Sequence, residues 1–251
     1  MVVDGGTPKG GLGTIRNATL LMDLLARSPH LHQLTDLAAQ SGMTVPTVHR
    51  LLRSLVYADY AVQDPATSRY GLGQAVTRLA VHQLSSSPIL TALSPFMIGL
   101  RDQLGATIGV HVLIGDEAVC IDQTEAQDRG PFRRPLRSAP ALGSAAGRIL
   151  AAHADDEVWD ALVAAGAAAD GSADVTADVT TRRSEWQAAE HLVFESADPT
   201  ASNEVAVPVR AADGAVVAAL TADLRADADP GTVAASLTRT AASCGRSIAH
   251  G

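Results

Sequence analysis

Apolar residues recur at helical spacing in two short segments near the start of the chain. In the first segment, Leu34, Leu37 and Ala38 share one face, and Ser41-Gly42 ends it where glycine permits a tight left-handed turn. In the second segment, the apolar residues fall at i, i+3, i+4 and i+7, namely Val48, Leu51, Leu52 and Leu55. The pattern predicts two helices that are joined by a turn and that each bury one stripe.

A helix before this pair and a hairpin after it complete the unit. Residues 14–28 have helical spacing that ends at Pro29, and the expected inward stripe is Ile15, Ala18, Met22 and Leu25. Residues 60–63 and 69–72 are β-prone and flank Asp64-Pro-Ala-Thr-Ser, whose residue types favour a turn. Three helices and a hairpin predict a winged helix-turn-helix over residues 14–73.

The polar face of the second helix of the turn carries the candidate chemistry of this unit. Thr44 is the expected N-cap, and Pro46 stands in the first turn. Arginine, histidine and threonine on such a face suit base edges and phosphates in a DNA major groove. The residues that we expect to contact DNA are Thr44, Pro46, Thr47, His49, Arg50, Arg53 and, on the hairpin, Arg69. The alternative is an ordinary core helix with solvated arginines, and Arg69 fits a solvated hairpin residue equally well.

The rest of the chain alternates between helical and β-prone patterns. A helix over residues 74–84 is broken at Ser85-Ser-Ser-Pro88, which indicates a linker helix followed by a hinge. We expect a loop over residues 164–180, which are rich in Ala, Asp and Gly. The other expected elements are helices over residues 89–104 (interrupted or restarted at Ser94-Pro95), 143–153, from 155 onward and about 230–249, and strands over 107–114, 118–121, 205–210 and 216–224.

These elements predict an α+β protein of two domains. We expect residues 1–13 to form a disordered tail and residues 14–73 the winged helix-turn-helix domain. Residues 74–87 form the expected linker helix. Residues 88–251 form the expected C-terminal domain, in which helices flank an antiparallel sheet.

The net charge of −8 is unevenly divided between these domains. Residues 1–73 hold 6 Lys and Arg against 5 Asp and Glu, a formal charge of +1, which leaves −9 for residues 74–251. The acidic surplus therefore lies outside the winged domain, which is free to approach DNA. Because that domain is only weakly basic, we expect affinity to depend on several copies acting together.

Composition narrows the remaining classes. The chain has no run of about 18 apolar residues and no signal-peptide pattern at its start, so we expect no membrane partner. The two cysteines, Cys120 and Cys244, have no partner at metal-ligand spacing. We therefore expect a reduced, cytoplasmic protein with no metal and no cofactor.

Five stretches resemble the IclR (isocitrate lyase regulator) family of bacterial transcription factors. They are residues 47–52 together with the hairpin end Arg69-Tyr-Gly-Leu-Gly, the small-residue segment 140–152, and the strand segments 205–209 and 213–220. The resemblance runs from about Ile15 to Ile248. It implies a winged-helix domain and a GAF-like effector domain whose curved sheet cups a small organic molecule. It also implies homodimers, commonly assembled as dimers of dimers, on palindromic double-stranded operator DNA.

The resemblance places an effector pocket in the C-terminal domain. The residues that it implies are Ile121, Asp122, Ser144, Ala145, Asn203 and Glu204. Free backbone N–H groups at Ser144 and Ala145 would hold an anion. Relatives often carry a Cys at the position of Glu204 and a Gly several residues earlier, where this chain has Ala201. A carboxylate there would repel an acidic effector unless it points away or pairs with an arginine.

Two further features leave alternatives open. The basic segment Arg129–Arg137 is either a loop whose arginine covers the effector or a solvated loop. Cys120 fits a small core residue better than a redox sensor.

An enzyme-like or metabolite-binding C-terminal domain, with the winged domain used for protein contacts, is the alternative function. Gly143-Ser-Ala-Ala-Gly147 differs from the Gly-x-Ser-x-Gly elbow. No spacing forces any histidine onto a nucleophile and an acid, and the residues considered for such a triad are Ser144, Asp122, His111, His153 and His191. We therefore expect a ligand-responsive transcriptional regulator that is not an enzyme.

Overall fold

The computed structural model describes residues 11–27, 29–127, 138–170, 173–195, 203–224 and 228–248. The chain divides into two compact units, residues 1–83 and 84–251, and each unit is considered by itself. The expected tail over residues 1–13 lies mostly outside the described residues. Its last three residues, Gly11–Gly13, instead belong to the first helix.

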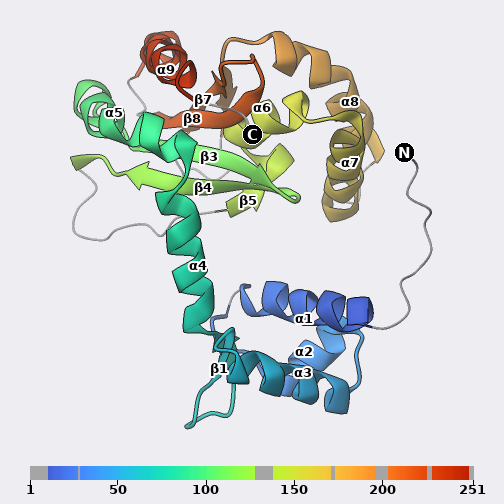
Figure 1. The fold of residues 1–251 in the computed structure, drawn as a ribbon. Coiled ribbons are helices and arrows are strands. Elements are labelled where there is room, and N and C mark those ends of the chain that lie inside the picture. The colour runs from blue at the N-terminus through green and yellow to red at the C-terminus, as the bar shows by residue number, and fades with distance from the viewer. Residues whose placement is uncertain are drawn as a thin grey trace. The chain divides into compact units, whose positions relative to one another are not determined.

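The first unit is a winged helix-turn-helix (Figure 1). Helices α1 (Gly11–Leu25), α2 (Leu34–Ser41) and α3 (Val45–Tyr57) precede strands β1 (Ala61–Gln63) and β2 (Tyr70–Leu72), and α4 (Gln74–Ser85) follows them. The two strands pair antiparallel. His32 and Tyr70 exchange backbone hydrogen bonds of 2.8 and 2.9 Å, which attach the segment before α2 to β2. The expected three helices and hairpin are confirmed.

The core of this unit follows the apolar stripes with one exception. Leu37 and Ala38 on α2 are buried, as is the whole expected stripe of α3. Gly42 ends α2 with φ of 68°, which is the left-handed conformation that glycine favours. Ile15, however, is 64% exposed, and the face of α1 that is buried carries Leu21, Leu24 and Leu25. The expected stripe of α1 is therefore wrong at Ile15, while its other members, Ala18, Met22 and Leu25, belong to this core.

The second unit is built on a six-stranded antiparallel sheet. The order of its strands is β5-β4-β3-β8-β7-β6. The β3–β4 hairpin therefore lies beside the β7–β8 pair, and β3 pairs with β8. The strands are β3 (Ile108–Ile114), β4 (Glu117–Thr124), β5 (Ser138–Pro140), β6 (Leu192–Phe194), β7 (Asn203–Arg210) and β8 (Val216–Leu224). The sequence predicted β3, β4, β7 and β8 but missed the three-residue edge strands, which are too short to show an alternating pattern.

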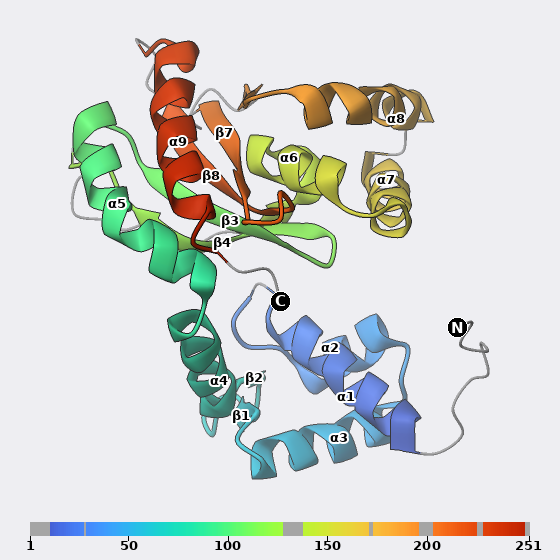
Figure 2. The ribbon, with the colours of Figure 1, turned by 45° about the horizontal axis from the view of Figure 1, so that its top comes forward.

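Helices cover both faces of this sheet (Figure 2). Against one face, α5 (Pro88–Leu104) and α9 (Pro230–Gly245) form the larger core, with odd-numbered valines of β7 such as Val205 and Val207. Against the other face, α6 (Ala145–His153) packs on Ala206 and Ala219. Alternation along β7 therefore sends successive side chains to different helices. This property decides which predicted site residues can meet.

The expected loop over residues 164–180 is wrong. Residues 164–170 belong to α7 (Asp156–Asp170) and residues 173–180 to α8 (Ala173–Ala188), and in both helices the strong helix propensity of alanine outweighs Gly166 and the scattered Asp and Thr residues. The expected interruption at Ser94-Pro95 is also wrong, because α5 continues through Pro95, which lies on its exposed side.

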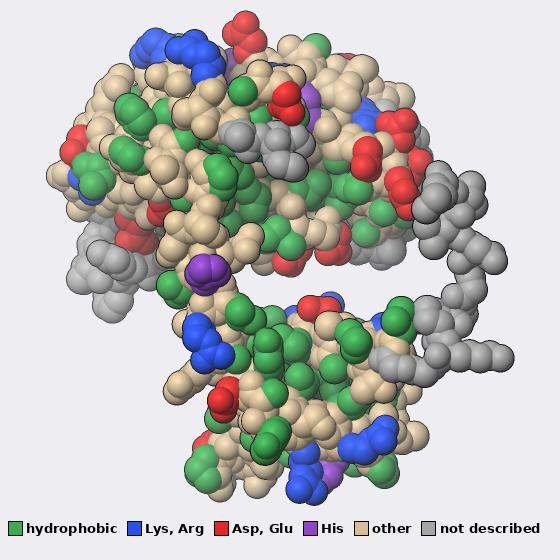
Figure 3. All heavy atoms as spheres, viewed as in Figure 1, with side chains coloured by type: hydrophobic (Ala, Val, Ile, Leu, Met, Phe, Trp, Pro, Cys, Tyr) green, Lys and Arg blue, Asp and Glu red, His purple; other side chains and the backbone are tan. Residues whose placement is uncertain are grey.

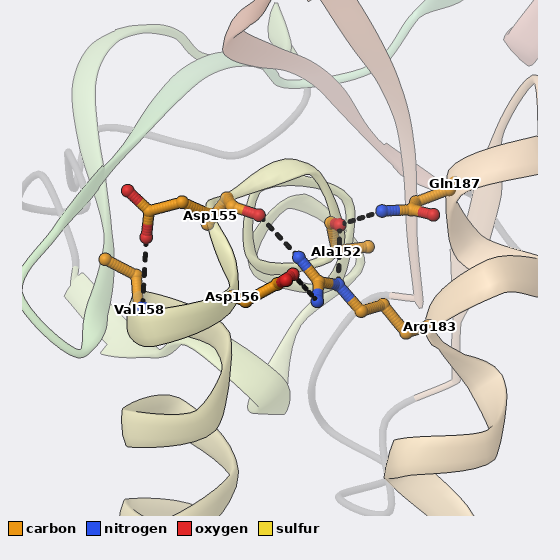
Figure 4. Close-up of polar contacts among 7 residues, drawn as sticks. Ala152, Asp155, Asp156, Val158, Arg183 and Gln187 are labelled. Atoms are coloured by element: carbon orange, nitrogen blue, oxygen red, sulfur yellow. Dashed lines mark hydrogen bonds and ion pairs between the residues drawn. The ribbon is translucent and has the colours of Figure 1, made fainter.

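Arg183 attaches α8 to the end of α6 (Figure 4). Its guanidinium donates to the carbonyl oxygens of Ala152 (3.2 Å) and Ala154 (2.6 Å) and pairs with Asp156 at 2.7 Å. The same group lies over the ring of Trp159, 5.0 Å from its centroid. The bonded carbonyls belong to the last turn of α6 and to its C-cap residue Ala154, where a helix has no intrahelical donors for them. Arg183 is therefore a C-terminal cap supplied from a distant helix.

Candidate functional site

The first candidate site is the exposed face of α3. Because Val48, Leu51, Leu52 and Leu55 fill the buried stripe, the helical period turns the intervening polar residues outward. The side chains that line a surface hollow of about 420 Å³ on this face are His49, Arg50, Arg53, Ser54 and Tyr57. In Figure 3 basic side chains and a histidine gather together on this part of the first unit.

Both arginines of this face are available to a ligand. In the part of the chain that the structure describes, neither Arg50 nor Arg53 forms an ion pair, and both side chains are exposed. A guanidinium with unused donors suits the paired acceptors of a phosphate or of a guanine edge. Tyr57 is 94% exposed at the end of the same face, and the sequence interpretation did not single it out. An exposed aromatic residue one turn after Arg53 was the signal available for it.

The start of α3 leaves backbone donors free of side-chain caps. Thr44 occupies the N-cap position, with φ of −69° and ψ of 147°, but its side chain caps no backbone N–H. Its hydroxyl instead bonds the Thr47 hydroxyl at 2.9 Å. Thr44 is therefore the N-cap residue, as expected, but it contributes no side-chain capping bond because the two hydroxyls bond each other. Pro46 stands in the first turn, as expected. Uncapped N–H groups at a helix start attract anions such as phosphate.

The hairpin has an internally satisfied tip. The Asp64 carboxylate accepts hydrogen bonds from the N–H groups of Ala66 and Thr67 and from the Thr67 hydroxyl. The Thr67 hydroxyl is the largest cause of the lowered pKa of Asp64, followed by the Ala66 N–H. Arg69 is half-buried at the end of the turn, and its carbonyl accepts from the Asp64 N–H at 2.8 Å. The hairpin therefore presents Arg69 from a fixed turn.

The second candidate site lies where α6 begins above β7 and β8. The N–H of Ala145, the first residue of α6, donates to Oε2 of Glu204 at 3.3 Å. Ser144 is the N-cap, and its hydroxyl accepts from the Gly147 N–H at 3.0 Å. The expectation of a free N–H group is therefore wrong at Ala145, whose N–H already holds an internal carboxylate. Glu204 points at the helix start, since β7 carries it on the α6 face.

The other implied pocket residues lie on the opposite face of the sheet. Ile121 packs into the core that α5 and α9 share, and the Asp122 carboxylate accepts a hydrogen bond from the Ser94 hydroxyl of α5. Asn203 alternates with Glu204 and pairs in register with Leu224 of that same core. Of the six residues implied by resemblance, only Ser144, Ala145 and Glu204 come together.

Three residues that the sequence interpretation did not place at this site share the α6 face with Glu204. Asp223 of β8 lies directly across from Glu204 in the β7–β8 register. Thr221, two residues before Asp223 on β8, lies on the same face of the sheet. The Thr221 hydroxyl lies 3.3 Å from the Gly109 carbonyl and 3.4 Å from Nδ1 of His111. Strand register brings them together, and register is not visible in one sequence. We name this set, with Ala145, the Glu204 corner: Ala145, Glu204, Asp223, Thr221 and His111.

Burial sets the protonation of this corner. It raises the pKa of Glu204 to about 7, and the Asp223 carboxylate acts in the same direction, while the N–H groups of Ala145 and Ala146 oppose the shift. Burial also lowers the pKa of His111 to about 4, so its imidazole is neutral at pH 7. Because the His111 imidazole is neutral at pH 7, none of the five residues of the Glu204 corner carries a positive side chain at that pH.

No catalytic triad is assembled from the residues considered for one. His111 faces Thr221, while Asp122 lies on the other side of the sheet. His153 bonds the Ile149 carbonyl through Nδ1 and Arg210 through Nε2. Among the described residues no group of three His, Cys, Asp or Glu side chains is placed to hold a metal ion. The segment Arg129–Arg137 lies outside the described residues.

Comparison with known proteins matches both units to one family. The family model of the IclR helix-turn-helix domain matches residues 14–65, and that of the bacterial transcriptional regulator IclR C-terminal domain matches residues 81–182. The chain belongs to the IclR family. Within this family, residues 14–65 are the helix-turn-helix domain, and the later match falls on the C-terminal domain that contains the Glu204 corner.

Curated relatives of this IclR-family chain include transcriptional repressors. The HTH-type transcriptional repressor AllR of Salmonella paratyphi A is 28% identical over 145 residues, which are 57% of this chain and 53% of the relative. AllR of Escherichia coli is 27% identical over 141 residues, which are 56% and 52% of the two chains. The alignment thus spans about half the length of these relatives.

Solved structures share the fold over nearly the whole chain. An IclR-family regulator from Brucella abortus has a TM-score of 0.77 at 18% identity and covers 96% of each chain. A regulator from Alicyclobacillus acidocaldarius has a TM-score of 0.74 at 21% identity, covering 94% of this chain and 98% of that one. An IclR homologue from Microbacterium hydrocarbonoxydans in complex with 4-hydroxybenzoate has a TM-score of 0.69 at 16% identity, covering 92% and 97%. Within the described residues, no helix is long and apolar enough to cross a membrane.

Proposed function

We propose that this chain is a cytoplasmic, ligand-responsive DNA-binding transcriptional regulator. The single observation that carries the proposal is the face of α3, where Arg50 and Arg53 are exposed opposite a fully buried apolar stripe and form no ion pair with any described residue. A helix held by one face and basic on the other is suited to enter a major groove. The AllR relatives are named repressors, so repression is the sign of regulation that we propose.

The proposed division of labour follows the two units. Residues 14–73 form the DNA-reading head, residues 74–87 the linker helix, and residues 88–251 the effector and assembly domain. DNA contacts come from Thr44, Pro46, Thr47, His49, Arg50, Arg53 and Arg69. The chain acts as a homodimer, or as a dimer of dimers, on palindromic operators, and two heads meet successive major grooves about 34 Å apart. The weak charge of one head, +1, favours this multivalent arrangement.

A small organic effector occupies the C-terminal domain in this proposal. The Microbacterium neighbour is in complex with 4-hydroxybenzoate, which supports a small organic ligand for this fold. The buried polar groups of the Glu204 corner, beside the start of α6, support that place for the effector. The effector alters DNA affinity by binding one arrangement of the heads more tightly than another, because a ligand shifts only states that it binds differently.

The test is a mobility shift with the full chain and duplex DNA from upstream of its own and neighbouring genes, titrated with salt and with competitor DNA. We expect a specific shift that weakens steeply as salt rises, because phosphate contacts release counterions. Arg50→Ala should weaken operator binding by about 1–3 kcal/mol. Arg27→Ala removes the same charge from an exposed position after α1 and should leave binding nearly unchanged.

Two outcomes would contradict the proposal. Equal losses in Arg50→Ala and Arg27→Ala would remove α3 as the reading face and leave only general electrostatics. Absence of any duplex affinity at low salt, with the protein folded and a metabolite library added, would favour the alternative, in which the winged domain serves protein contacts.

A further inference from the structure

One oxygen of Glu204 is buried without a hydrogen-bond partner. Oε2 accepts the Ala145 N–H, whereas Oε1 is inaccessible to solvent and, among the described residues, has no partner. Buried carboxylate oxygens are almost always bonded, so an unpaired one marks a position that a donor is suited to fill. The residue is half-buried overall, and it is its carboxylate end that lies inside, against the start of α6.

The start of α6 is already occupied by this internal anion. Helix starts bind carboxylates through free N–H groups and the positive end of the helix dipole. Here the Ala145 N–H donates to Glu204 and the Gly147 N–H to the Ser144 hydroxyl. A ligand carboxylate would have to displace Glu204 from these donors or lie beside it. Either arrangement places two carboxyl groups in one buried corner, which is unfavourable unless one is protonated.

The groups that face Glu204 add to this preference. From β8, Asp223 stands directly across from it, and Thr221 presents a hydroxyl on the same face. From β3, His111 is neutral at pH 7. From β6, Phe194 is the register partner of Glu204, and the Arg148 guanidinium of α6 lies over that ring, 4.9 Å from its centroid, while it donates to the Leu142 carbonyl. The Arg148 guanidinium is thus directed at an aromatic ring and a carbonyl, while Oε1 of Glu204 is an acceptor without a partner among the described residues.

We infer that the effector presents a cationic or amide N–H donor group to Oε1 of Glu204, in the manner of an amidinium or a primary amide, and not a carboxylate. This inference rests on the proposed effector site, because it names the chemistry of the ligand that this site takes. The ligand donor completes the hydrogen bonding of Oε1. The corner therefore selects by charge as well as by shape.

The test measures binding of matched probes to the full chain in the absence of DNA. The probes are acetamidine, acetamide and acetate, and the larger set benzamidine, benzamide and benzoate, in which only the head group changes. The amide resonance of Ala145, whose N–H bonds Glu204, reports occupancy of the corner by NMR. We expect the amidines and amides to bind at least ten times more tightly than the matching carboxylates.

Two variants assign the preference to Glu204. Glu204→Gln retains an acceptor for the Ala145 N–H but removes the charge, so it should weaken amidine binding about tenfold and change amide binding only a few-fold. Glu204→Ala empties the start of α6 and should allow the carboxylates to bind there. Glu117→Gln removes a charge from an exposed position of β4 and should change neither affinity.

A carboxylate preference in the wild-type chain would overturn the inference, since it would mean that a cation of the chain neutralises Glu204. Failure of all amidines and amides to perturb Ala145 would overturn it equally. If the variants do not fold, the ordering of the probes on the wild-type chain still decides. Because no DNA is present, these results are independent of whether the chain binds an operator, so failure of the proposed DNA function would appear only in the mobility shift.

Discussion

Replacement of Glu204 by Gln should change how the stability of the second unit depends on pH. The pKa of Glu204 is raised from 4.5 to about 7 in the folded chain, chiefly by burial. Between these values the folded state holds a proton that the unfolded state has released, so stability falls as pH rises. Each pKa unit corresponds to about 1.4 kcal/mol. The full contribution is therefore about 3 kcal/mol, of which roughly 2 kcal/mol falls between pH 5 and pH 7.5.

His111 acts in the opposite direction over much of the same range. Its pKa is lowered from 6.5 to about 4, so the folded state holds fewer protons than the unfolded state between these values, and stability rises with pH there. In the wild-type chain the two trends largely cancel. The informative quantity is thus the difference in unfolding free energy between the wild type and Glu204→Gln, because both chains retain His111.

Tryptophan fluorescence during urea unfolding isolates this unit. The chain has two tryptophans, Trp159 and Trp186, and their rings pack edge to face in the second unit with centroids 6.1 Å apart. We expect the wild type to lose roughly 2 kcal/mol relative to Glu204→Gln as pH rises from 5 to 7.5. The exposed control Glu117→Gln should stay within about 0.5 kcal/mol of wild type throughout. A constant difference between wild type and Glu204→Gln would refute the assignment of a buried, desolvated carboxyl.

Three further predictions address packing. Gly147→Ala should destabilise the second unit by at least about 3 kcal/mol in the same fluorescence assay, because an added Cβ would lie 1.9 Å from the Ala141 carbonyl oxygen. An unchanged unfolding transition would contradict this close approach. Arg183→Ala should cost about 2 kcal/mol by uncapping α6, whereas the exposed neighbour Arg182→Ala should cost far less, and equal costs would deny the cap. Leu52→Ala should lower the unfolding free energy of the first unit by about 2–5 kcal/mol. Tyrosine fluorescence measures this unfolding, since all three tyrosines lie in the first unit. A smaller loss would mean that the α3 stripe is loosely packed.

Local pattern was enough for the helix-turn-helix. The stripe of α3 and the left-handed Gly42 depend on residues that are close in sequence, and the structure places both as expected. The exposed side of α3 follows directly, because a helix with one buried stripe must turn its other residues outward. The same local rules failed for Ile15. The pattern of residues 11–18 fits several choices of buried helix face about equally well, and only packing against the rest of the unit selects one.

Propensity also misjudged the segment between α6 and β6. Alanine-rich residues with scattered Gly, Asp and Thr fit a loop or a helix, and contacts between residues far apart in sequence decide between them. Arg183 of α8 caps α6, and Trp186 of α8 packs on Trp159 of α7. Such partners are distant in the chain and have no periodic signal.

The sequence by itself determined two domains, the winged head, the positions of the four longer strands along the chain and the unusual carboxylate at position 204. Tertiary structure alone decided what that carboxylate meets. Asn203 and Glu204 are adjacent in sequence, yet alternation on β7 sends them to opposite faces, and pairing with β8 sets Asp223 beside Glu204. Strand register and the placement of α6 arise from contacts across the whole unit. For this reason the Glu204 corner could be named only once the sheet was known.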